Sequence, residues 1–378
     1  MMPPTGYSLG VLTEERRARI AAELQVSGAV EVRELAERFD VSVITIRRDL
    51  ASVVASSPPS RRVRGGAVRE PAGAAPERSR ARSARSPRET AHDGEGALVG
   101  IVVPARDYYY RAVVDGAHDE ADRLGLRLLL GVSDYSRQDE VTLVERMLAR
   151  GVDALLVTPA RTQSADARIY RLLADARVPV VLIEREVPDP FSGIESVHTD
   201  HALGMAAAMR HLIALGHRRI GLAMRPRNPT GPWLRAGMAL ARDEAGPSVQ
   251  TFEHTVGPGT GEEYTRSLRE VLESVRAAGE SAMVVLSDHE AVDLADAAPA
   301  AGLRVPQDLA IVAYDDERAA DATVPLTAVA PPKRDLGRLA VRMCADRFAE
   351  RDAPAERALS PRRQVLLPTL RVRASTTT

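Results

Sequence analysis

From Ala97 onward, short apolar runs alternate with longer amphipathic stretches, and no other feature of the sequence constrains the fold as strongly. The predicted strands are 98–103, 127–132, 153–158, 178–183, 219–224, 281–287 and 309–314. Their near-continuous hydrophobicity is typical of parallel strands covered on both faces, with helices between them. About 280 residues are many for one open sheet, so we expect an α/β body with two lobes.

The N-terminal residues follow a different pattern, in which apolar positions predict three short helices. The third helix is expected to begin after Ser42 and to turn Ile46 and Leu50 inward. The stretch RRVRGGAV (61–68) predicts two short strands around a Gly-Gly turn. Three helices followed by a hairpin indicate a small winged helix-turn-helix domain over residues 10–70.

Composition separates this domain from the body. Residues 71–96 are rich in Pro, Ala, Arg, Ser and Gly and hold almost no large apolar side chain, which predicts a flexible linker. Residues 97–378 are then the two-lobed ligand-binding domain. Residues 1–90 hold 16 Arg and 11 acidic residues, a net charge of +5, whereas the remainder has a net charge of −6. A basic N-terminal segment predicts an anionic partner there, nucleic acid first.

The predicted third helix and hairpin carry side chains suited to DNA. Arg can bond guanine edges or phosphate, and hydroxyls near a helix N-terminus can reach base edges or backbone oxygens. The predicted DNA-binding residues are Ser42, Thr45, Arg47, Arg48, Arg61, Arg62 and Arg64. The run RRARIAAELQVSGAVEVRELAERFDVSVITIRRDL, followed by RRVRGGAV, resembles the DeoR family of bacterial regulators.

The body resembles another family, the effector domain of LacI/GalR regulators. The matching stretches include YYYRAVVDGAHDEADRLGLRLLL, LARGVDALLVTP, VPVVLIER, GLRVPQDLAIVAYDD and VPLTAVAPPKRDLGRLAV. The resemblance implies a two-lobed periplasmic-binding-protein-like fold, a sugar or other small metabolite bound between the lobes, and a homodimer. The usual LacI-type helix-turn-helix and hinge helix are absent, and the DeoR-like domain stands in their place.

Candidate ligand-binding residues follow the predicted strands, because ligands in open α/β sheets bind beyond the carboxyl ends of strands. Three of the eight tyrosines stand together in ARDYYYR (105–111) after the first strand. Aromatic rings can stack on the C–H face of a sugar while hydroxyls bond its OH groups. In the resemblance the paired aromatic positions fall on Tyr109 and Tyr110, although the helical register also allows Tyr110 to be a core residue.

Polar groups follow other strands. The resemblance places ligand contacts at Glu184, Arg185 and Asp315, where carboxylates accept hydrogen bonds from vicinal hydroxyls and Arg clamps hydroxyl or carboxylate groups. Asp288 is equally compatible with a helix cap and with a ligand contact.

The helix around residue 235 carries two further candidates. The family has an arginine three residues before a glycine, but Leu234 holds that position here and Arg235 lies one step off. Trp233, the single tryptophan, fits either sugar stacking or core packing.

Enzymatic motifs are missing from the sequence. Lys333 is the single lysine against fifty arginines, so no Walker A loop exists, and there is no G-x-S-x-G or H-E-x-x-H motif. HTDH (198–201) lacks further ligands for a metal, and Asp200 is read as a helix cap. GPGTGE (257–262) is read as a loop. We therefore expect no catalysis, no metal and no cofactor.

Together these features predict a ligand-responsive transcription regulator, a repressor of carbohydrate uptake or catabolism genes that binds double-stranded operator DNA and a sugar-like effector. The single cysteine, Cys344, suits a reducing cytoplasm, and neither a signal peptide nor a membrane span is evident. Two alternatives stay open: a non-exported solute-binding protein, and a sugar-phosphate enzyme with a DNA-binding head.

Overall fold

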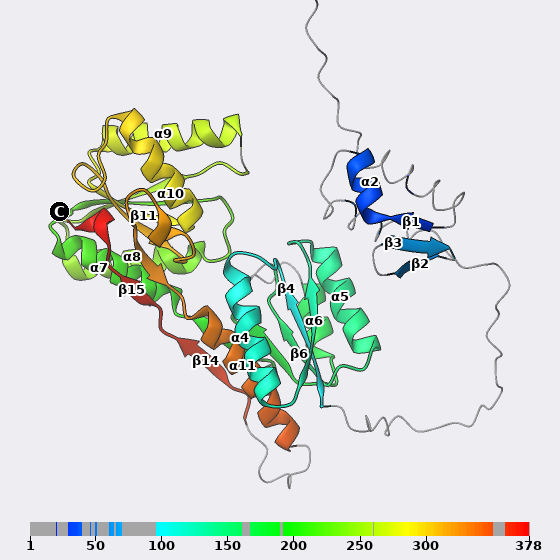
Figure 1. Cartoon of the computed structure of the whole chain (residues 1–378). Helices are drawn as coiled ribbons and strands as arrows, with labels where there is room; N and C mark the ends of the chain where they lie inside the picture. The colour runs from blue at the N-terminus through cyan, green and yellow to red at the C-terminus, as the bar shows by residue number, and fades with distance from the viewer. Residues whose placement is uncertain are drawn as a thin grey trace, which may run out of the picture. The chain divides into compact units, whose positions relative to one another are not determined.

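In a computed structural model the chain forms two compact units, Met1–Glu89 and Thr90–Thr378 (Figure 1). The described residues are 20, 29–39, 46, 50, 60–63, 66–69, 96–160, 167–189, 192–259, 261–350 and 360–377.

The described part of the first unit is a three-stranded antiparallel sheet with one helix. The elements are β1 (Ala29–Glu31), α2 (Val32–Arg38), β2 (Ser60–Val63) and β3 (Gly66–Arg69). Strand order is β1-β3-β2, and Val63 pairs with Gly66 at the hairpin turn. The predicted wing is therefore confirmed, and β1, which the sequence pattern did not indicate, extends it to three strands.

A small apolar core holds this unit together, and Ile46 and Leu50 are buried in it as predicted. Its other buried members are Ile20, Val30, Val32, Leu35 and Ala36. Of the predicted DNA-binding residues, Ser42, Thr45, Arg47, Arg48 and Arg64 lie outside the described residues. Arg61 and Arg62 lie on β2, where only the backbone is described.

The second unit has two lobes, and the first, here called the N-lobe, contains an all-parallel sheet in the order β14-β8-β7-β6-β4-β5. The strands are β4 (Leu98–Val103), β5 (Arg127–Val132), β6 (Ala154–Val157), β7 (Val180–Ile183), β8 (Glu195–Thr199) and β14 (Arg363–Leu366). One face packs on α4 (Tyr109–Arg123) and α11 (Lys333–Glu350). The other packs on α5 (Arg137–Ala149) and α6 (Ala167–Ala174).

The C-lobe repeats this arrangement with the strand order β10-β9-β11-β12-β13-β15, parallel except for β15. Its strands are β9 (Arg219–Met224), β10 (Gln250–Thr255), β11 (Ala282–Leu286), β12 (Ala310–Tyr314), β13 (Thr327–Ala330) and β15 (Thr369–Arg371). One face packs on α7 (His201–Ala214) and α8 (Gly231–Ala245). The other packs on α9 (Glu262–Ala278) and α10 (Asp288–Ala297). Short 3-10 helices are η2 (Ala298–Ala301), η3 (Ala319–Asp321) and η5 (Ala374–Thr376).

Glycine allows the helices of the N-lobe to touch. A Cβ on Gly116 of α4 would overlap the carbonyl oxygen of Arg334, and a Cβ on Gly337 of α11 would overlap that of Val113. The two helix backbones therefore cross in direct contact. This contact matters for function because α4 begins at Tyr109 and α11 begins at Lys333, so the crossing fixes the starting points of both helices.

The chain passes between the lobes three times. It leaves the N-lobe after β8, returns after β13 to form α11, and crosses again between β14 and β15. In Figure 1, β14 and β15 form the continuous red and dark-red segment that runs from one lobe to the other. The two lobes are therefore joined by three neighbouring segments rather than one linker.

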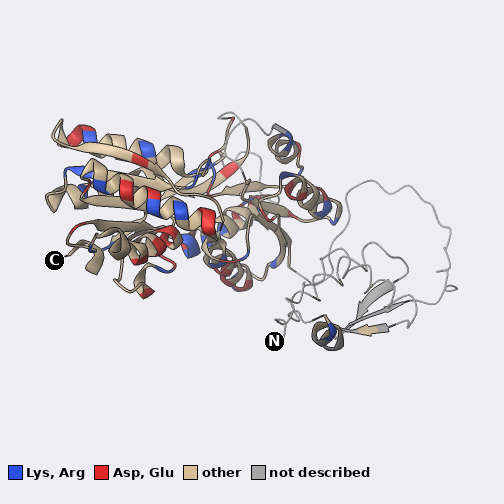
Figure 2. Cartoon of the chain, turned by 90° about the horizontal axis from the view of Figure 1, so that it is seen from above, with Lys and Arg blue, Asp and Glu red and all other residues tan. Residues whose placement is uncertain are grey.

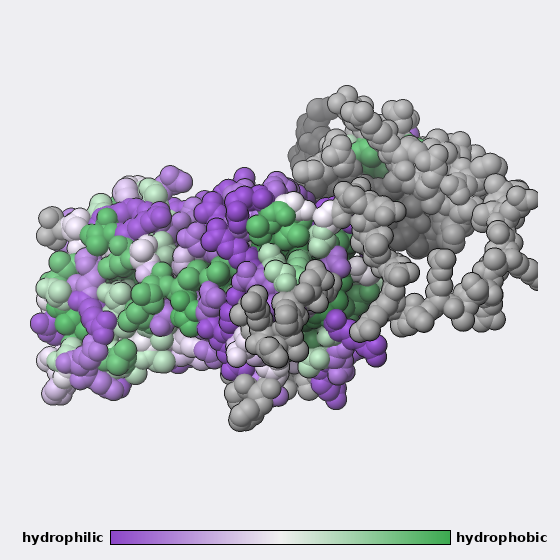
Figure 3. Space-filling view, turned by 90° about the horizontal axis from the view of Figure 1, so that it is seen from below, coloured by the Kyte–Doolittle hydropathy of each residue, from purple (hydrophilic) through white to green (hydrophobic). Residues whose placement is uncertain are grey.

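The surface of this body carries mixed charge. Basic and acidic residues alternate along the helix in the foreground of Figure 2, without a large area of one sign on that helix. Hydrophobic areas are interrupted by hydrophilic ones on the face in Figure 3. The large apolar side chains that are exposed among the described residues are Tyr135, Leu215, Leu240, Val365, Leu367 and Val372. Among the described residues, no helix is both long and apolar enough to cross a bilayer.

Candidate functional site

Backbone strain marks one region of the body. Seven non-glycine residues among those described have a positive φ, a conformation that side chains rarely adopt. They are Tyr108, Asp134, Tyr135, Glu184, Arg227, Asp315 and Asp316. All follow the carboxyl end of a sheet strand: β4, β5, β7, β9 or β12. Because such conformations cost energy and gather at binding sites, we take these strand ends as the candidate site.

Glu184 is the best-connected group on the N-lobe side. It follows β7 and is 2 % exposed. Its carboxylate accepts hydrogen bonds from the backbone N–H of Thr199 at 3.0 Å, from the Thr199 hydroxyl at 2.7 Å, and from the Tyr109 hydroxyl. Burial alone would raise its pKa, but the charge of His201 and these hydrogen bonds outweigh burial and hold the pKa at about 2. Glu184 is therefore ionised.

The tyrosine run divides its rings between different environments. Tyr110 lies on α4, is 7 % exposed and packs in the hydrophobic core of the N-lobe, in agreement with its helical register. Burial raises the pKa of Tyr110 to about 12. Tyr109 is half-buried; its hydroxyl donates to Glu184, and the Lys333 ammonium lies 5.1 Å from its ring centroid. Tyr109 therefore contacts Glu184 and Lys333, whereas Tyr110 packs in the hydrophobic core next to it.

Arg185 is buried beside Glu184, with its guanidinium held by backbone oxygens. Its Nε donates to the carbonyl of Pro159 at 2.7 Å, and its Nη1 donates to the carbonyl of Glu184 at 2.6 Å. Both acceptors are neutral, so they orient the guanidinium without cancelling its charge.

Asp288 begins α10 and is fully buried, but it is not the cap of that helix. Ser287 holds the N-cap position in a capping box with Glu290. The Oδ2 atom of Asp288 instead accepts three backbone N–H groups of the turn after β12, those of residues 317–319. Asp288 thus ties two neighbouring strand ends together, a structural role that neither reading of the sequence anticipated.

Asp315 follows β12 and lies beside Lys333. The Lys333 ammonium donates to the backbone carbonyl of Asp315 and to the carboxylate of Glu317. Burial and the nearby Asp288 raise the pKa of Asp315 to about 7, although Lys333 opposes the shift. Lys333, the single lysine of the chain, is 6 % exposed, and its ammonium lies among these buried polar groups.

Besides Lys333, which lies on the N-lobe helix α11 and bonds Asp315 and Glu317 of the C-lobe, two more residues join the lobes through their side chains. His201 at the start of α7 places its Nε2 3.3 Å from Oε2 of Glu184. Tyr108, before α4, donates its hydroxyl to Asp288 and lies 3.2 Å from Oδ2 of Asp315. We call the group formed by Tyr108, Tyr109, Glu184, His201, Asp288, Asp315 and Lys333 the interlobe polar cluster.

The helix after β9 places its two candidates differently. The half-buried Trp233 stacks on His201, with ring centroids 5.8 Å apart and an angle of 30°. Arg235 is exposed, and its Nε lies 2.9 Å from a carboxylate oxygen of Glu253 on β10. The structure therefore brings Trp233 to the interlobe polar cluster and Arg235 to a surface ion pair.

Sequence reasoning missed Tyr108, His201 and Lys333 as members of the site. In the sequence, His201 stood out only as a possible metal ligand in HTDH, and Lys333 only as the single lysine of the chain. The available signals were the run of three tyrosines for Tyr108 and the single occurrence of lysine for Lys333. Asp200, read as a helix cap, does cap α7, because its Oδ1 accepts the N–H of Leu203 at 2.8 Å.

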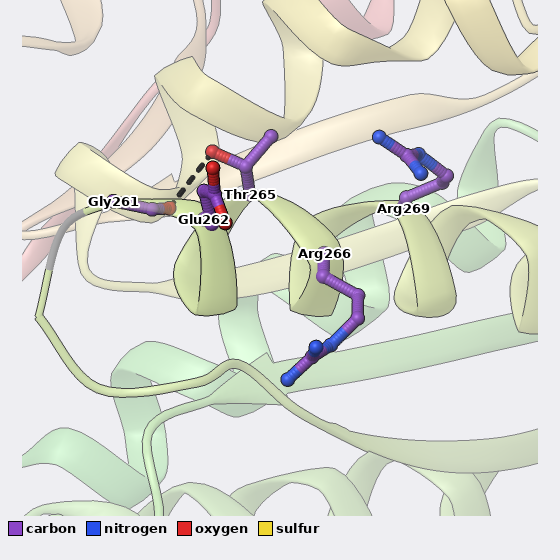
Figure 4. A pocket seen from close by; sticks show the side chains of 5 residues that line it. All are labelled: Gly261, Glu262, Thr265, Arg266 and Arg269. Carbon is purple, nitrogen blue, oxygen red and sulfur yellow. Dashed lines mark hydrogen bonds between the residues drawn. The ribbon is translucent and has the colours of Figure 1, made fainter.

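Two hollows lie elsewhere on the surface. One is at the start of α9, lined by Gly261, Glu262, Thr265, Arg266 and Arg269 (Figure 4). The side chains of Arg266 and Arg269 extend away from each other in this view. The other adjoins α4, α11 and β14, lined by Arg123, Leu124, Leu339, Arg342, Met343, Ala345, Asp346, Arg362 and Gln364. Neither includes a residue of the interlobe polar cluster, which has the buried charges and strained backbone that the hollows lack.

Two families match parts of the chain. A periplasmic binding protein-like domain matches residues 209–376, and a DeoR-like helix-turn-helix domain matches residues 16–70.

Relatives with described functions match the body. The arabinose metabolism transcriptional repressor of Geobacillus stearothermophilus is 30 % identical over 263 residues, 67 % of this chain and 71 % of the relative. The ribose operon repressor of Escherichia coli (strain K12) is 28 % identical over 256 residues, 67 % of this chain and 76 % of the relative.

Solved structures agree with the fold. A complex described as the transcriptional regulator CelR with cellobiose has a TM-score of 0.62 at 25 % identity and covers 74 % of this chain and 85 % of that one. The transcription regulator CcpA of Lactococcus lactis has a TM-score of 0.61 at 24 % identity, covering 75 % and 100 %.

Proposed function

Because this chain belongs to the LacI-type family of transcriptional repressors and carries a DeoR-like helix-turn-helix, we propose that it represses carbohydrate uptake or catabolism genes until a sugar-like effector binds between its lobes. The observation that carries this proposal is the interlobe polar cluster, which gathers buried hydrogen-bonding groups from the strand ends of both lobes. Two relatives are named as repressors of arabinose metabolism and of the ribose operon, and the CelR structure is a complex with cellobiose. All of these relatives are regulators rather than enzymes, and we propose no catalysis.

The proposed DNA contacts lie on the third helix and the wing. Because Ile46 and Leu50 are buried, the other faces of that helix remain for DNA, and they carry Thr45, Arg47 and Arg48. Ser42 at the start of the helix and the wing residues Arg61, Arg62 and Arg64 complete the proposed interface. We further propose a homodimer, because paired DNA half-sites require two such domains.

The proposed effector contacts combine acceptors, a cation and rings. Asp315 and Glu184 would accept hydrogen bonds from sugar hydroxyls, and Arg185 would donate to them. Tyr109 and Trp233 offer ring faces, with Tyr110 and Asp288 supporting the site behind them. Arg235 would have to exchange its pair with Glu253 for the effector, and it remains a proposed contact on the strength of the resemblance alone.

The DNA-binding part is tested by fluorescence anisotropy with duplex DNA from upstream of the gene, measured from about 50 to 200 mM salt. We expect affinity to fall steeply with salt, because bound phosphates release counterions. The double substitution Arg47→Ala and Arg48→Ala should reduce the logarithmic salt slope by about 2 if both contact phosphate. Arg106→Ala, an exposed substitution in the body, should keep the wild-type slope. An unchanged slope in the double variant would contradict the assigned helix.

The effector part is tested by thermal melts with arabinose, ribose and cellobiose. A sugar at about 100 times its Kd stabilises the folded protein by about 2.7 kcal/mol. We expect one of these sugars to raise the Tm of the wild type and to lose this effect in Asp315→Asn. A shift that survives in Asp315→Asn would place the sugar elsewhere.

A further inference from the structure

Tyr108 has an unusual position for a residue at the start of a helix. It lies between β4 and α4 with φ at 50°, at the N-cap position of α4, yet its side chain makes no capping hydrogen bond. No capping hydrogen bond of the tyrosine offsets the energetic cost of this backbone conformation. The conformation is explained instead by where the side chain goes, which is out of the N-lobe and into the C-lobe.

The Tyr108 side chain makes its hydrogen bonds and its ring contact with residues of the C-lobe. Its hydroxyl donates to Oδ1 of Asp288 and lies 3.2 Å from Oδ2 of Asp315. Its ring centroid lies 4.7 Å from that of His289 on α10. These partners are 180 or more residues away in the sequence. Tyr109, the next residue, bonds Glu184 within its own lobe, so the cross-lobe reach belongs to Tyr108.

The phenol hydroxyl of Tyr108 occupies acceptors that a sugar hydroxyl would use. Oδ2 of Asp288 is saturated by three backbone N–H groups, which leaves Oδ1 for a hydroxyl donor. Asp315 is the residue proposed above to accept from the effector. A phenol between two carboxyl groups therefore reproduces, within the chain, the hydrogen bond that an effector would make.

We propose that Tyr108 is a built-in competitor of the effector: its hydroxyl bonds the carboxyl groups of Asp288 and Asp315, holds the lobes together without ligand, and must be displaced for the effector to bind Asp315. Tyr108 thereby sets effector affinity, because each binding event first breaks its cross-lobe hydrogen bonds. The closing role rests on the contacts above, and the affinity role rests in addition on the proposed function of Asp315.

The closing role is tested without ligand by a distance between spin labels. The substitutions Gln138→Cys and Glu263→Cys put labels on exposed positions at the first turns of α5 and α9, one on each lobe. The native Cys344 is buried, so these two sites react selectively. We expect Tyr108→Phe to lengthen and broaden the distance distribution relative to the wild type.

Tyr264→Phe is the matched control. It also removes a tyrosine hydroxyl that donates to a carboxylate, that of Asp293 at 2.6 Å, but both residues lie within the C-lobe. Its distance distribution should match the wild type. If Tyr108→Phe keeps the wild-type distance while circular dichroism shows it folded, the closing role is wrong.

The affinity role is tested by calorimetric titration with arabinose, ribose and cellobiose. Because the competing hydrogen bond is lost, Tyr108→Phe should bind a sugar that the wild type binds with a Kd about tenfold lower. Weaker binding would overturn the proposal, because it would make Tyr108 a direct effector contact. If neither protein binds a sugar, the proposed effector class fails, whereas the label distances still decide whether Tyr108 closes the lobes.

Discussion

Glu184 and His201 face each other where the lobes meet, with 3.3 Å between Oε2 of the carboxylate and Nε2 of the imidazole. Glu184 directly follows strand β7 of the N-lobe, and His201 begins the first helix of the C-lobe. Both side chains are almost completely buried. The pair therefore stabilises the first of the three crossings, and its removal should be felt in the stability of the whole body.

Glu184→Gln should destabilise the protein by about 3 kcal/mol at neutral pH, because a buried histidine loses its carboxylate partner. The pKa of Glu184 is lowered to about 2 in the folded state, below its ordinary value of 4.5. Its stabilising effect is therefore present above pH 4.5 and is lost as the pH falls toward 2. Thermal melts of both proteins from neutral to acidic pH should show two Tm curves that converge in acid, and parallel curves would contradict the assignment.

Compared with that of Glu184, the contribution of Asp315 to folding stability should have the opposite pH dependence. Its folded pKa of about 7 is raised above the ordinary 3.8, so the folded state binds the proton more tightly than the unfolded state. Asp315 therefore contributes most to stability below about pH 4, and this contribution decreases as the pH rises to about 7. The groups that face it are Lys333, Asp288, His201 and Tyr108.

In Asp315→Asn this pH dependence should disappear, so that the variant gains stability relative to the wild type between about pH 4 and 7. Melts across this range measure the difference. Asp296→Asn, an exposed substitution on α10, should follow the wild-type curve. A constant difference between Asp315→Asn and the wild type would show that Asp315 does not titrate in this range.

The crossing of α4 and α11 predicts a steric effect. Gly337→Ala places a methyl group against the backbone of Val113 and should force the helices apart, at a cost of about 2 to 3 kcal/mol. Gly193→Ala is the control, since its Cβ would meet nothing within 4 Å. Denaturant unfolding should show a lower midpoint for Gly337→Ala only, and equal midpoints would mean that the helices have room to separate.

Trp233 provides an optical measurement, because it is the single tryptophan and stacks on His201. Binding of arabinose, ribose or cellobiose at the interlobe polar cluster should change its emission spectrum. Trp233→Leu should weaken that binding by a factor of about 3 to 10, the usual worth of one aromatic contact. A sugar that raises the Tm without changing the emission would bind away from this helix.

The sequence predicted seven strands of the body, three of them to the residue. The runs 98–103, 127–132 and 219–224 coincide with β4, β5 and β9. Five strands of the body were missed, among them β8 and β10. Strand β10 is an edge strand, QTFEHT, with an exposed or half-exposed residue at each position, so burial imposes no apolar pattern on it. Strand β8, ESVHT, is largely buried although only Val197 in it is apolar, because Glu195 pairs with Arg347 and Arg362.

The strand ends were predictable as site positions, but the contacts between them were not. Glu184 and Asp315 were expected there because a parallel sheet gathers its carboxyl ends at one edge. Tyr108, rather than Tyr109, crosses to the other lobe. This depends on the positive φ angle of Tyr108, which no sequence pattern predicts. Arg235 likewise meets Glu253 because β10 lies beside β9, a pairing that becomes visible only with the sheet order.

The three crossings mean that neither lobe is a continuous stretch of sequence. The N-lobe is assembled from residues before His201 and from α11 with β14, and β15 belongs to the C-lobe sheet. Truncation at any single point within residues 98–371 would therefore remove part of one lobe or both, and would not release a complete lobe. A protease that nicks one crossing would leave the halves tethered by the other two, so the nicked chain would still migrate as one particle under native conditions.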